Sequence, residues 1–396
     1  MHRNDHDWPF GRFWFNHEIL LSRLSKRYGV QEDAHRWLQS YLSGRKQFIT
    51  INGRKSAERN KTCDVPQGSV LGPNLYKDYF AAPVSDILRR HNLDYHIYAD
   101  DTQIYLPFSP GEEQSAIQKL EACLAEVRQW MATNFLQLND SKTEFIVFGS
   151  SRNLSLLQPM AISIGQATIT SSEDGYVRNI GAVLDSNMNM AKQLATTCKS
   201  AWHHLYQISK IRRYLTVDQS KSVIHAFVTS RLDQNNSLLI GLPKKSTKCL
   251  QSVQNASAKL IMGVKKHDHV TPLLKTLHWL PVEHRILFKV LLLTFKALQN
   301  EGPIYLKNLL NYYQPSRNLR SSSSGLLCVP KTKFVETSRR AFFARAPTEY
   351  NKLPKDIRDC SSVSSFKSKL KTHLFKIAFN WCPFTYIDVT NFKYGF

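Results

Sequence analysis

The sequence predicts an α+β fold in which strands and helices alternate up to about residue 186 and helices dominate the remainder. Short β-prone runs flank two turn signals, Asn52-Gly53 and the adjacent acids Asp100-Asp101. Apolar residues then recur at helical spacing from Leu194 to Leu215. The first half should therefore carry antiparallel strands with packing helices, and the second half should be mainly helical.

In the first half, helices are expected at residues 18–28, 32–42 and 74–91, and a strand pair around residues 47–51 should turn at Asn52-Gly53. Residues 109–112 resemble a capping box with Pro110 at the first helical position. The amphipathic helix that follows should pack on a sheet, since five apolar residues recur every three or four positions. They are Ile117, Leu120, Leu124, Val127 and Met131. Two further strands are expected at residues 144–148 and 180–184.

In the second half, a helix capped by Thr216 and Gln219 should follow the 194–215 segment, and others should cover residues 248–262, 284–299 and 364–371. The serine run at residues 320–325 is typical of a flexible linker. Basic residues alternate with the apolar positions of the 194–215 segment. They are Lys199, His203, Lys210, Arg212 and Arg213. Such a face is either a solvated surface or a contact for a polyanion.

The chain has 53 Lys and Arg against 31 Asp and Glu, a formal charge of +22, so nucleic acid is the first partner to consider. The seven cysteines are scattered and form no Cys-x-x-Cys pair, which is typical of reduced thiols in an intracellular protein, nuclear or cytoplasmic. The N-terminus lacks the pattern of a secretory signal. The longest apolar stretch, residues 286–298, is too short and too charged to span a membrane.

The acid pair Asp100-Asp101 follows Tyr98-Ala99 between two β-prone segments. Two adjacent carboxylates repel each other, so a hairpin that presents them usually binds cations, although a lone pair in a solvated turn is the plainer interpretation. About 30 residues upstream, residues 65–73 form a turn-rich Val-Pro-Gln-Gly-Ser-Val-Leu-Gly-Pro segment whose glycines allow a ligand to approach the backbone. Carboxylates that bridge two Mg²⁺ ions are what a nucleotidyl-transfer site requires.

With these two segments, residues 18–380 resemble the reverse transcriptase of a LINE-type, non-LTR retrotransposon of the jockey-like branch. Further segments carry the likeness in order: residues 138–144, 179–189, 230–233, 250–255, 277–282 and 350–354. The resemblance implies a partial polymerase palm at residues 18–190, a helical thumb-like region at 191–315, and a basic linker with a C-terminal helical region at 316–396. Residues 1–17 would be unrelated or degenerate.

The resemblance also assigns roles to single residues. Asp100 would be a metal ligand with Asp101 beside it near the primer end, and Tyr98 would support the hairpin. Lys142 occupies the position of a lysine that protonates the leaving pyrophosphate, although an exposed structural lysine explains it equally well. The nucleotide and template site would be lined by Gln67, Gly68 and Ser69. The primer and duplex contacts would come from Gly181, Lys199, Lys210, Arg212 and Arg213.

The resemblance breaks at the N-terminus. The family's first palm strand carries the third metal carboxylate, and counting back from His17 places Asp7 in that register, although Pro9 and Arg12 fit a central palm strand poorly. The family's fingers and endonuclease are not recognisable. We therefore expect an N-terminally truncated reverse transcriptase with weakened activity. It would use Mg²⁺, deoxynucleoside triphosphates, an RNA template and a DNA primer, with no membrane partner and an undetermined oligomeric state. The alternative is an inactive relative that binds RNA or an RNA–DNA duplex.

Overall fold

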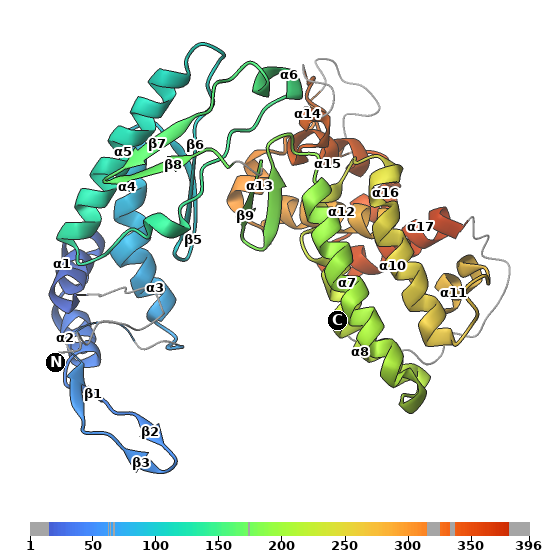
Figure 1. Cartoon of the computed structure of the whole chain (residues 1–396), viewed down its shortest axis with the longest axis horizontal. Coiled ribbons are helices and arrows are strands. Elements are labelled where there is room, and N and C mark those ends of the chain that lie inside the picture. The colour runs from blue at the N-terminus through green and yellow to red at the C-terminus, as the bar shows by residue number, and fades with distance from the viewer. Residues whose placement is uncertain are drawn as a thin grey trace. The chain divides into compact units, whose positions relative to one another are not determined.

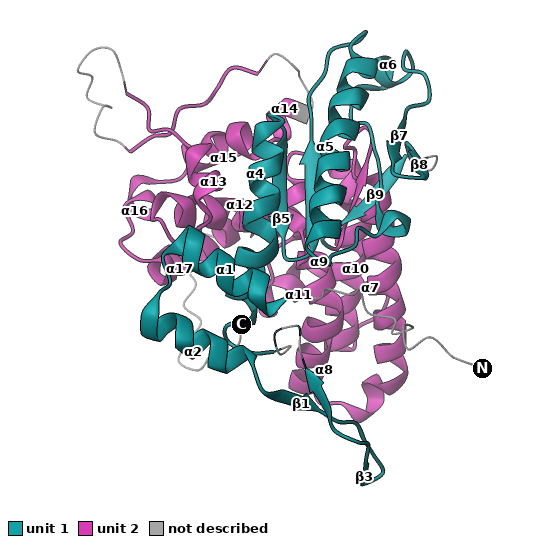
Figure 2. Ribbon diagram, turned by 90° about the vertical axis from the view of Figure 1, so that its left-hand side faces the viewer, with its two compact units in different colours: residues 1–180 teal, residues 181–396 magenta. Residues whose placement is uncertain are grey.

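The computed structural model describes residues 16–61, 63, 65, 68–172, 175–314, 325–332 and 337–379. The chain divides into two compact units, Met1–Ile180 and Gly181–Phe396, which Figure 2 shows in two colours. Each unit is described by itself. Helices and strands mix in the first unit and helices dominate the second, as Figure 1 shows, so the predicted α+β class is confirmed.

The first unit begins with two helices at the predicted positions, α1 (His17–Tyr28) and α2 (Glu32–Leu42). The side chain of Asn16 caps α1 by accepting a hydrogen bond from the backbone N–H of Ile19 at 3.0 Å. Gly29 ends the helix with a φ of 67°, a left-handed conformation that glycine adopts without strain. The buried side chains Leu20 and Leu24 face the core of the unit.

An antiparallel ribbon follows α2. Its inner strands β1 (Arg45–Gln47) and β4 (Arg59–Lys61) pair, and its outer strands are β2 (Thr50–Ile51) and β3 (Arg54–Lys55). Asn52 and Gly53 both take positive φ angles, 50° and 78°, as the predicted Asn-Gly turn requires. Figure 1 shows the ribbon extending past α2, away from α4 (Ala82–Arg90) and α5 (Glu113–Thr133).

The predicted helix at residues 74–91 is helical but not continuous. It comprises α3 (Gly72–Tyr76), a π-helical turn at Lys77–Ala81, and α4 (Ala82–Arg90). The π-helical turn places Tyr79 and Phe80 in the core, where Tyr79 is fully buried. Its hydroxyl donates to the carbonyl of Asn134 at 2.8 Å and accepts from the N–H of Asn16 at 3.3 Å.

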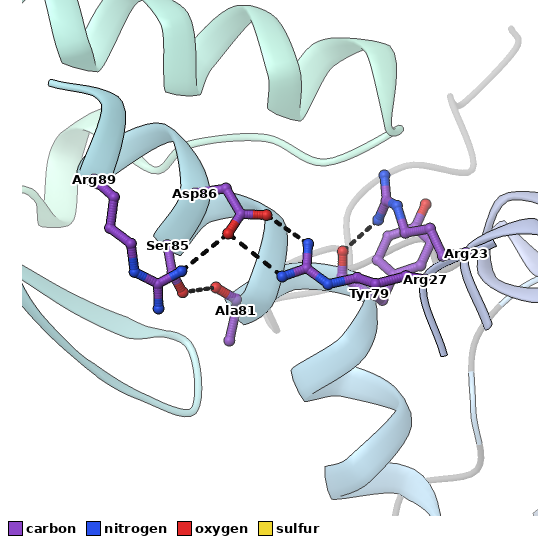
Figure 3. A network of polar contacts seen from close by, with 7 residues as sticks. All are labelled: Arg23, Arg27, Tyr79, Ala81, Ser85, Asp86 and Arg89. Carbon is purple, nitrogen blue, oxygen red and sulfur yellow. Dashed lines mark hydrogen bonds and ion pairs between the residues drawn. The ribbon is translucent and has the colours of Figure 1, made fainter. Parts of the chain in front are cut away.

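Arginines of α1 bind the interrupted helical segment formed by α3, the π-helical turn and α4, as Figure 3 shows. Arg23 donates to the carbonyl of Tyr79, and its guanidinium carbon lies 4.9 Å from the centre of the Tyr79 ring. Burial lowers the pKa of Arg23. Arg27 forms an ion pair with Asp86 of α4 at 2.5 Å and holds the pKa of that carboxyl below its usual range. These contacts fix α1 against the segment that leads out of α3.

Replacing Tyr79 by Phe is expected to lower the free energy of unfolding by about 1–3 kcal/mol, because the substitution leaves the buried Asn134 carbonyl and the Asn16 N–H without their partner. Urea denaturation measures the change. Tyr105→Phe is the matched control, since that ring is 53% exposed and its hydroxyl lies 3.5 Å from its nearest acceptor. Equal stabilities of the two variants would contradict the assigned role of Tyr79.

The predicted acid-bearing hairpin is formed by β5 (Asp94–Tyr98) and β6 (Asp101–Tyr105), which are antiparallel with Tyr98 opposite Asp101. Its inner face places Ile97 and Ile104 against the core. The predicted amphipathic helix is α5 (Glu113–Thr133). The predicted capping box forms only in part: the Glu112 carboxylate accepts the N–H of Ser109 at 3.0 Å, but the N–H of Glu112 donates to the carbonyl of Ser109, also at 3.0 Å, rather than to its hydroxyl. This turn precedes the helix, so Pro110 is not its first residue.

The segment after α5 contains less strand than the sequence predicts. Residues 144–148 form no strand, and Phe145 makes only an isolated parallel bridge to Ser171. The carboxylate of Glu144 instead accepts the N–H of Arg178 at 3.0 Å, so a side chain replaces a ladder hydrogen bond. The observed elements are α6 (Ser151–Leu154), the antiparallel pair β7 (Ala161–Ile164) and β8 (Ala167–Thr170), and β9 (Tyr176–Asn179).

The second unit begins with β10 (Ala182–Asp185), so the strand predicted at residues 180–184 starts late. Ile180 and Gly181 have φ angles of 43° and 74° and form a turn. The predicted helices α7 (Ala191–Ile211) and α8 (Val217–Ile224) are confirmed. The capping box of Thr216 and Gln219 is complete, with hydrogen bonds of 3.2 and 2.9 Å.

The helices predicted at residues 248–262, 284–299 and 364–371 are also confirmed. They are α10 (Lys244–Met262), α12 (Val282–Leu298) and α17 (Val363–Phe379). One apolar core lies around α7 and α10, and another around α12 and α17, where Phe295 and Phe366 stack with ring centres 4.0 Å apart.

The predicted linker lies outside the described residues apart from Gly325. The remaining helical bounds are α9 (Ser230–Asp233), α11 (Val270–Thr276), α13 (Ile304–Asn308), α14 (Thr337–Arg340), α15 (Phe342–Tyr350) and α16 (Lys355–Arg358). Among the helices of the described ranges, none has the length and hydropathy needed to cross a bilayer.

Candidate active site

The tip of the β5–β6 hairpin carries the predicted acid pair. Tyr98, Ala99, Asp100 and Asp101 are all exposed, and the Tyr98–Asp101 pair closes the strands. Ala99 adopts a φ of 52°, a left-handed conformation that costs an L-residue about 1–2 kcal/mol. The turn therefore has a defined shape that places two carboxylates at the solvent-facing end of a hairpin whose strands are anchored in the core.

Neither carboxylate has a hydrogen-bonding or ionic partner among the described residues. Within the part of the chain that the structure describes, Asp100 and Asp101 form no hydrogen bond or ion pair through their side chains. By contrast, Asp140 binds Arg128 at 2.9 Å and Asp86 binds Arg27. The hairpin tip thus presents free carboxylate oxygens, the donor atoms that hard divalent cations prefer.

The hairpin tip lies beside α3. Burial first, and the negative charges of Asp100 and Asp101 next, raise the pKa of the Tyr76 hydroxyl above its usual value. Tyr76 is the last residue of α3, a helix that begins at Gly72 in the predicted glycine-proline segment. The structure therefore brings the acid pair and the helix that continues this segment to one place.

The loop before α3 contains the predicted nucleotide-binding residues Gly68 and Ser69. Gly68 takes a φ of 82°, so any side chain there would be strained although the space is open. The hydroxyl of Ser69 accepts the N–H of Gly72 at 3.1 Å and tightens the turn into α3. Ser69 also lies beside Tyr41 of α2, whose pKa it lowers by hydrogen bonding. Gln67 lies outside the described residues.

The other predicted residues of the site are more dispersed. Lys142 is exposed in a short helical turn at Asp140–Lys142 and forms no ion pair with Asp100 or Asp101 among the described residues. Asp7 lies outside the described part of the chain. Gly181 occupies the turn before β10, where an added Cβ would come within 3.1 Å of the Gln234 side chain.

Most of the predicted basic residues of α7 and of the 3-10 turn that follows it at Arg212–Tyr214 face solvent. Lys199, Lys210 and Arg213 are exposed, and the Lys210 ammonium lies 4.5 Å from the Tyr206 ring centre. Arg212 differs, because its guanidinium donates to the carbonyls of Leu260 at 2.9 Å and Ile261 at 2.7 Å. These carbonyls end α10, so the position of Arg212 favours a helix-capping role.

A comparison with protein families gives the chain its relatives. The family described as reverse transcriptase (RNA-dependent DNA polymerase) matches residues 16–228, more than half of the chain. The chain belongs to this reverse transcriptase family. The match includes the Gly68–Ser69 loop, the hairpin with Asp100 and Asp101, and α7.

The similar curated proteins are reverse transcriptases of Drosophila melanogaster mobile elements. The probable RNA-directed DNA polymerase from transposon BS is 25% identical over 70% of this chain and 30% of its own length. The probable polymerase from transposon X-element is 25% identical over 57% of the chain and 24% of its length. The polymerase from mobile element jockey is 27% identical over 36% of the chain and 15% of its own length. The chain spans about a third or less of each relative, and the predicted jockey-like LINE resemblance is confirmed.

Sequence reasoning missed Tyr76 as part of the candidate site. Its hydroxyl is buried under the acid pair, yet in the sequence it is one aromatic residue among several in a helical segment. The sequence gives two weak signals of such a contact. Tyr76 lies three residues after Pro73, and it belongs to the segment that connects the glycine-proline loop to the hairpin. The contact itself depends on tertiary packing.

Proposed function

We propose that the chain catalyses RNA-directed DNA synthesis, adding deoxynucleotides to a primer 3′-hydroxyl at the hairpin tip. One observation carries the proposal: two exposed carboxylates, which have no ionic partner among the described residues, lie in a left-handed turn next to the helix that continues the Gly68–Ser69 loop. That arrangement leaves solvent-side space for a polynucleotide end and a nucleotide. Membership of the reverse transcriptase family supports the same chemistry.

Enzymes of this family generally use divalent metal ions, and the residues at the tip suit Mg²⁺. Mg²⁺ takes oxygen ligands and is usually held by one or two carboxylates, with substrate phosphates and waters completing its shell. Asp100 and Asp101 supply such carboxylates, and Asp7 is the proposed third. A pair of bound ions would activate the attacking hydroxyl and stabilise the leaving oxygen.

The remaining residues of the proposal bind and orient the substrates. Gly68 and Ser69, with Gln67, would bring the backbone close to the incoming nucleotide and template, while Tyr98 supports the turn. Lys142 would offset the charge that develops on pyrophosphate. The thumb-like region at residues 191–315 would hold the duplex through Lys199, Lys210 and Arg213, and Gly181, in the turn just before it, would contact the primer. In this scheme residues 18–190 form the palm and residues 316–396 a basic C-terminal region.

Primer extension tests the proposal directly. The purified chain with oligo-dT on poly-A, deoxythymidine triphosphate and Mg²⁺ is expected to extend the primer, and a chelator should abolish extension. Asp7→Asn should reduce it, and unchanged incorporation would show that the third ligand is misplaced. Absence of incorporation at any Mg²⁺ concentration, in a chain that still binds the duplex, would overturn the enzymatic proposal.

A second function, binding of RNA or an RNA–DNA duplex without catalysis, is favoured by the exposed face of α7. Aromatic side chains alternate there with basic ones: Trp202 is 44% exposed, Tyr206 is 61% exposed, and Lys199 and Lys210 lie near them in sequence. Such side chains stack on bases and neutralise phosphates with little sequence preference. Binding that weakens steeply with salt, without nucleotide incorporation, would support this function.

A further inference from the structure

The antiparallel ribbon at residues 45–61 is the most exposed element of the first unit. Every residue from 46 to 60 is exposed, including the apolar side chains of Phe48, Ile49 and Ile51, which are 46%, 51% and 67% exposed. At about 3.3 Å per residue, the eight residues from 45 to 52 can extend at most roughly 25 Å from the end of α2. An apolar and basic ribbon that projects so far contributes little to the core of the unit.

The ribbon is defined by its backbone rather than by packing. The strand pairing of the ribbon is interrupted between Gln47 and Thr50. Two hydrogen bonds between Ser56 and Ile49 span this interruption, both 2.9 Å long. The Ser56 N–H donates to the Ile49 carbonyl, and the Ser56 hydroxyl accepts the Ile49 N–H. The Asn52-Gly53 turn closes the end. The side chains therefore extend from a preformed two-stranded scaffold.

The charges of the ribbon fall into two groups. Lys46 forms an ion pair with Glu58, the sole acidic residue of the ribbon, at 3.1 Å, and the Lys55 ammonium lies 4.7 Å from the Phe48 ring centre. Arg54, Arg59 and Lys61 form no ion pair or hydrogen bond through their side chains within the described ranges.

The strand register places these three free cations along the scaffold. Directly paired residues share a face, and the pairs are Arg54 with Ile51, Arg59 with Gln47, and Lys61 with Arg45. Arg45 is directed towards α2, where its side chain donates to the carbonyl of Tyr41 at 2.6 Å. Unpaired positive charge thus runs from the base of the ribbon to its tip, next to the exposed Ile51.

We propose that the ribbon binds double-stranded DNA by entering its major groove. The major groove of B-form DNA is about 12 Å wide and admits a two-stranded ribbon, whereas the major groove of an A-form duplex is too deep and narrow. Arg54, Arg59 and Lys61 contact phosphates along the groove. Ile49 and Ile51 meet the methyl groups of thymine, which line the same groove. The proposal concerns a surface apart from the hairpin tip and does not require catalysis there.

Fluorescence anisotropy with a short DNA duplex, over a series of salt concentrations, tests the proposal. Arg54→Gln/Arg59→Gln/Lys61→Gln is expected to weaken binding at least about tenfold and to lower the slope of log affinity against log salt by about 2.7, since each lost phosphate contact contributes about 0.9. Affinity for an RNA–DNA hybrid of the same sequence should change much less.

Two further variants serve as controls. Lys265→Gln/Lys266→Gln/Lys289→Gln removes the same charge from exposed positions of the second unit and should leave most of the slope intact. Glu58→Gln releases Lys46 from its ion pair and should tighten binding to the DNA duplex, a gain that unfolding cannot imitate.

Four outcomes would overturn the proposal. They are an unchanged salt slope in the ribbon variant, equal losses in the two triple variants, an equal loss for the RNA–DNA hybrid, and unchanged or weaker DNA binding by Glu58→Gln. Anionic phosphatidylserine vesicles serve as the remaining probe. If the ribbon variant lost vesicle binding but kept DNA binding, the ribbon would be a membrane contact and the proposal would fail.

Discussion

Asp100→Asn is expected to lower the rate of primer extension at least about 1,000-fold, which corresponds to about 4 kcal/mol of transition-state stabilisation. The substitution preserves the size of the side chain but removes the charge that would hold a divalent ion at the hairpin tip. Asp100 is exposed and forms no side-chain hydrogen bond or ion pair within the described residues, so the fold should tolerate the change. Single-turnover extension at saturating primer and template measures the effect.

Asp94→Asn is the matched control, because Asp94 is an exposed acid at the opposite end of the same hairpin, paired with Tyr105. Its extension rate should stay within about twofold of the unsubstituted chain. Asp101→Asn should resemble Asp100→Asn, and a higher Mg²⁺ concentration should restore part of its rate. If Asp94→Asn and Asp100→Asn lost activity equally, net charge rather than a metal site would explain the result.

Phe366→Ala is expected to lower the free energy of unfolding of the second unit by about 3–5 kcal/mol. Phe366 of α17 is fully buried and stacks on Phe295 of α12, with ring planes 10° apart. Removing the ring leaves a cavity between the two helices and takes away the partner of another buried aromatic side chain. A loss of this size is a large part of the stability of a typical domain.

Urea denaturation followed by tryptophan fluorescence and circular dichroism measures this loss. Ile377→Ala is the control on the same helix, since Ile377 is 53% exposed and should change the stability by less than about 0.5 kcal/mol. Because Phe366 lies in the apolar core around α12 and α17, we expect the first unit to keep its own transition. A single transition that shifts as a whole would mean that the two units unfold together.

Much of the fold follows from local sequence signals. The helices α1, α2, α5 and α7 carry strong apolar periodicity, and the Asn52-Gly53 turn and the Thr216 capping box are specified by neighbouring residues. The failures occur where distant groups compete with local preference. Glu144 satisfies the N–H of Arg178 in place of a strand ladder.

The candidate site, like the fold, follows in part from local sequence signals and in part from contacts between distant residues. The acid pair and the turn at Gly68 could be predicted, because the two adjacent acids lie between β-prone runs and glycines mark the turn in the segment upstream. The position of Tyr76 close to the pair depends on how α3 packs beside the hairpin, which no local motif specifies. The capping contacts of Arg212 depend on how α7 and α10 pack, so the spacing of basic residues alone could not separate it from Lys210.

The phenol beneath the hairpin tip has an electrostatic consequence. Because burial and two nearby anions keep Tyr76 protonated, this described neighbour of the tip on α3 supplies a neutral dipole and not a counter-ion. The repulsion between the adjacent anions is therefore relieved from the water-facing side. A mobile cation drawn from solution meets little competition there.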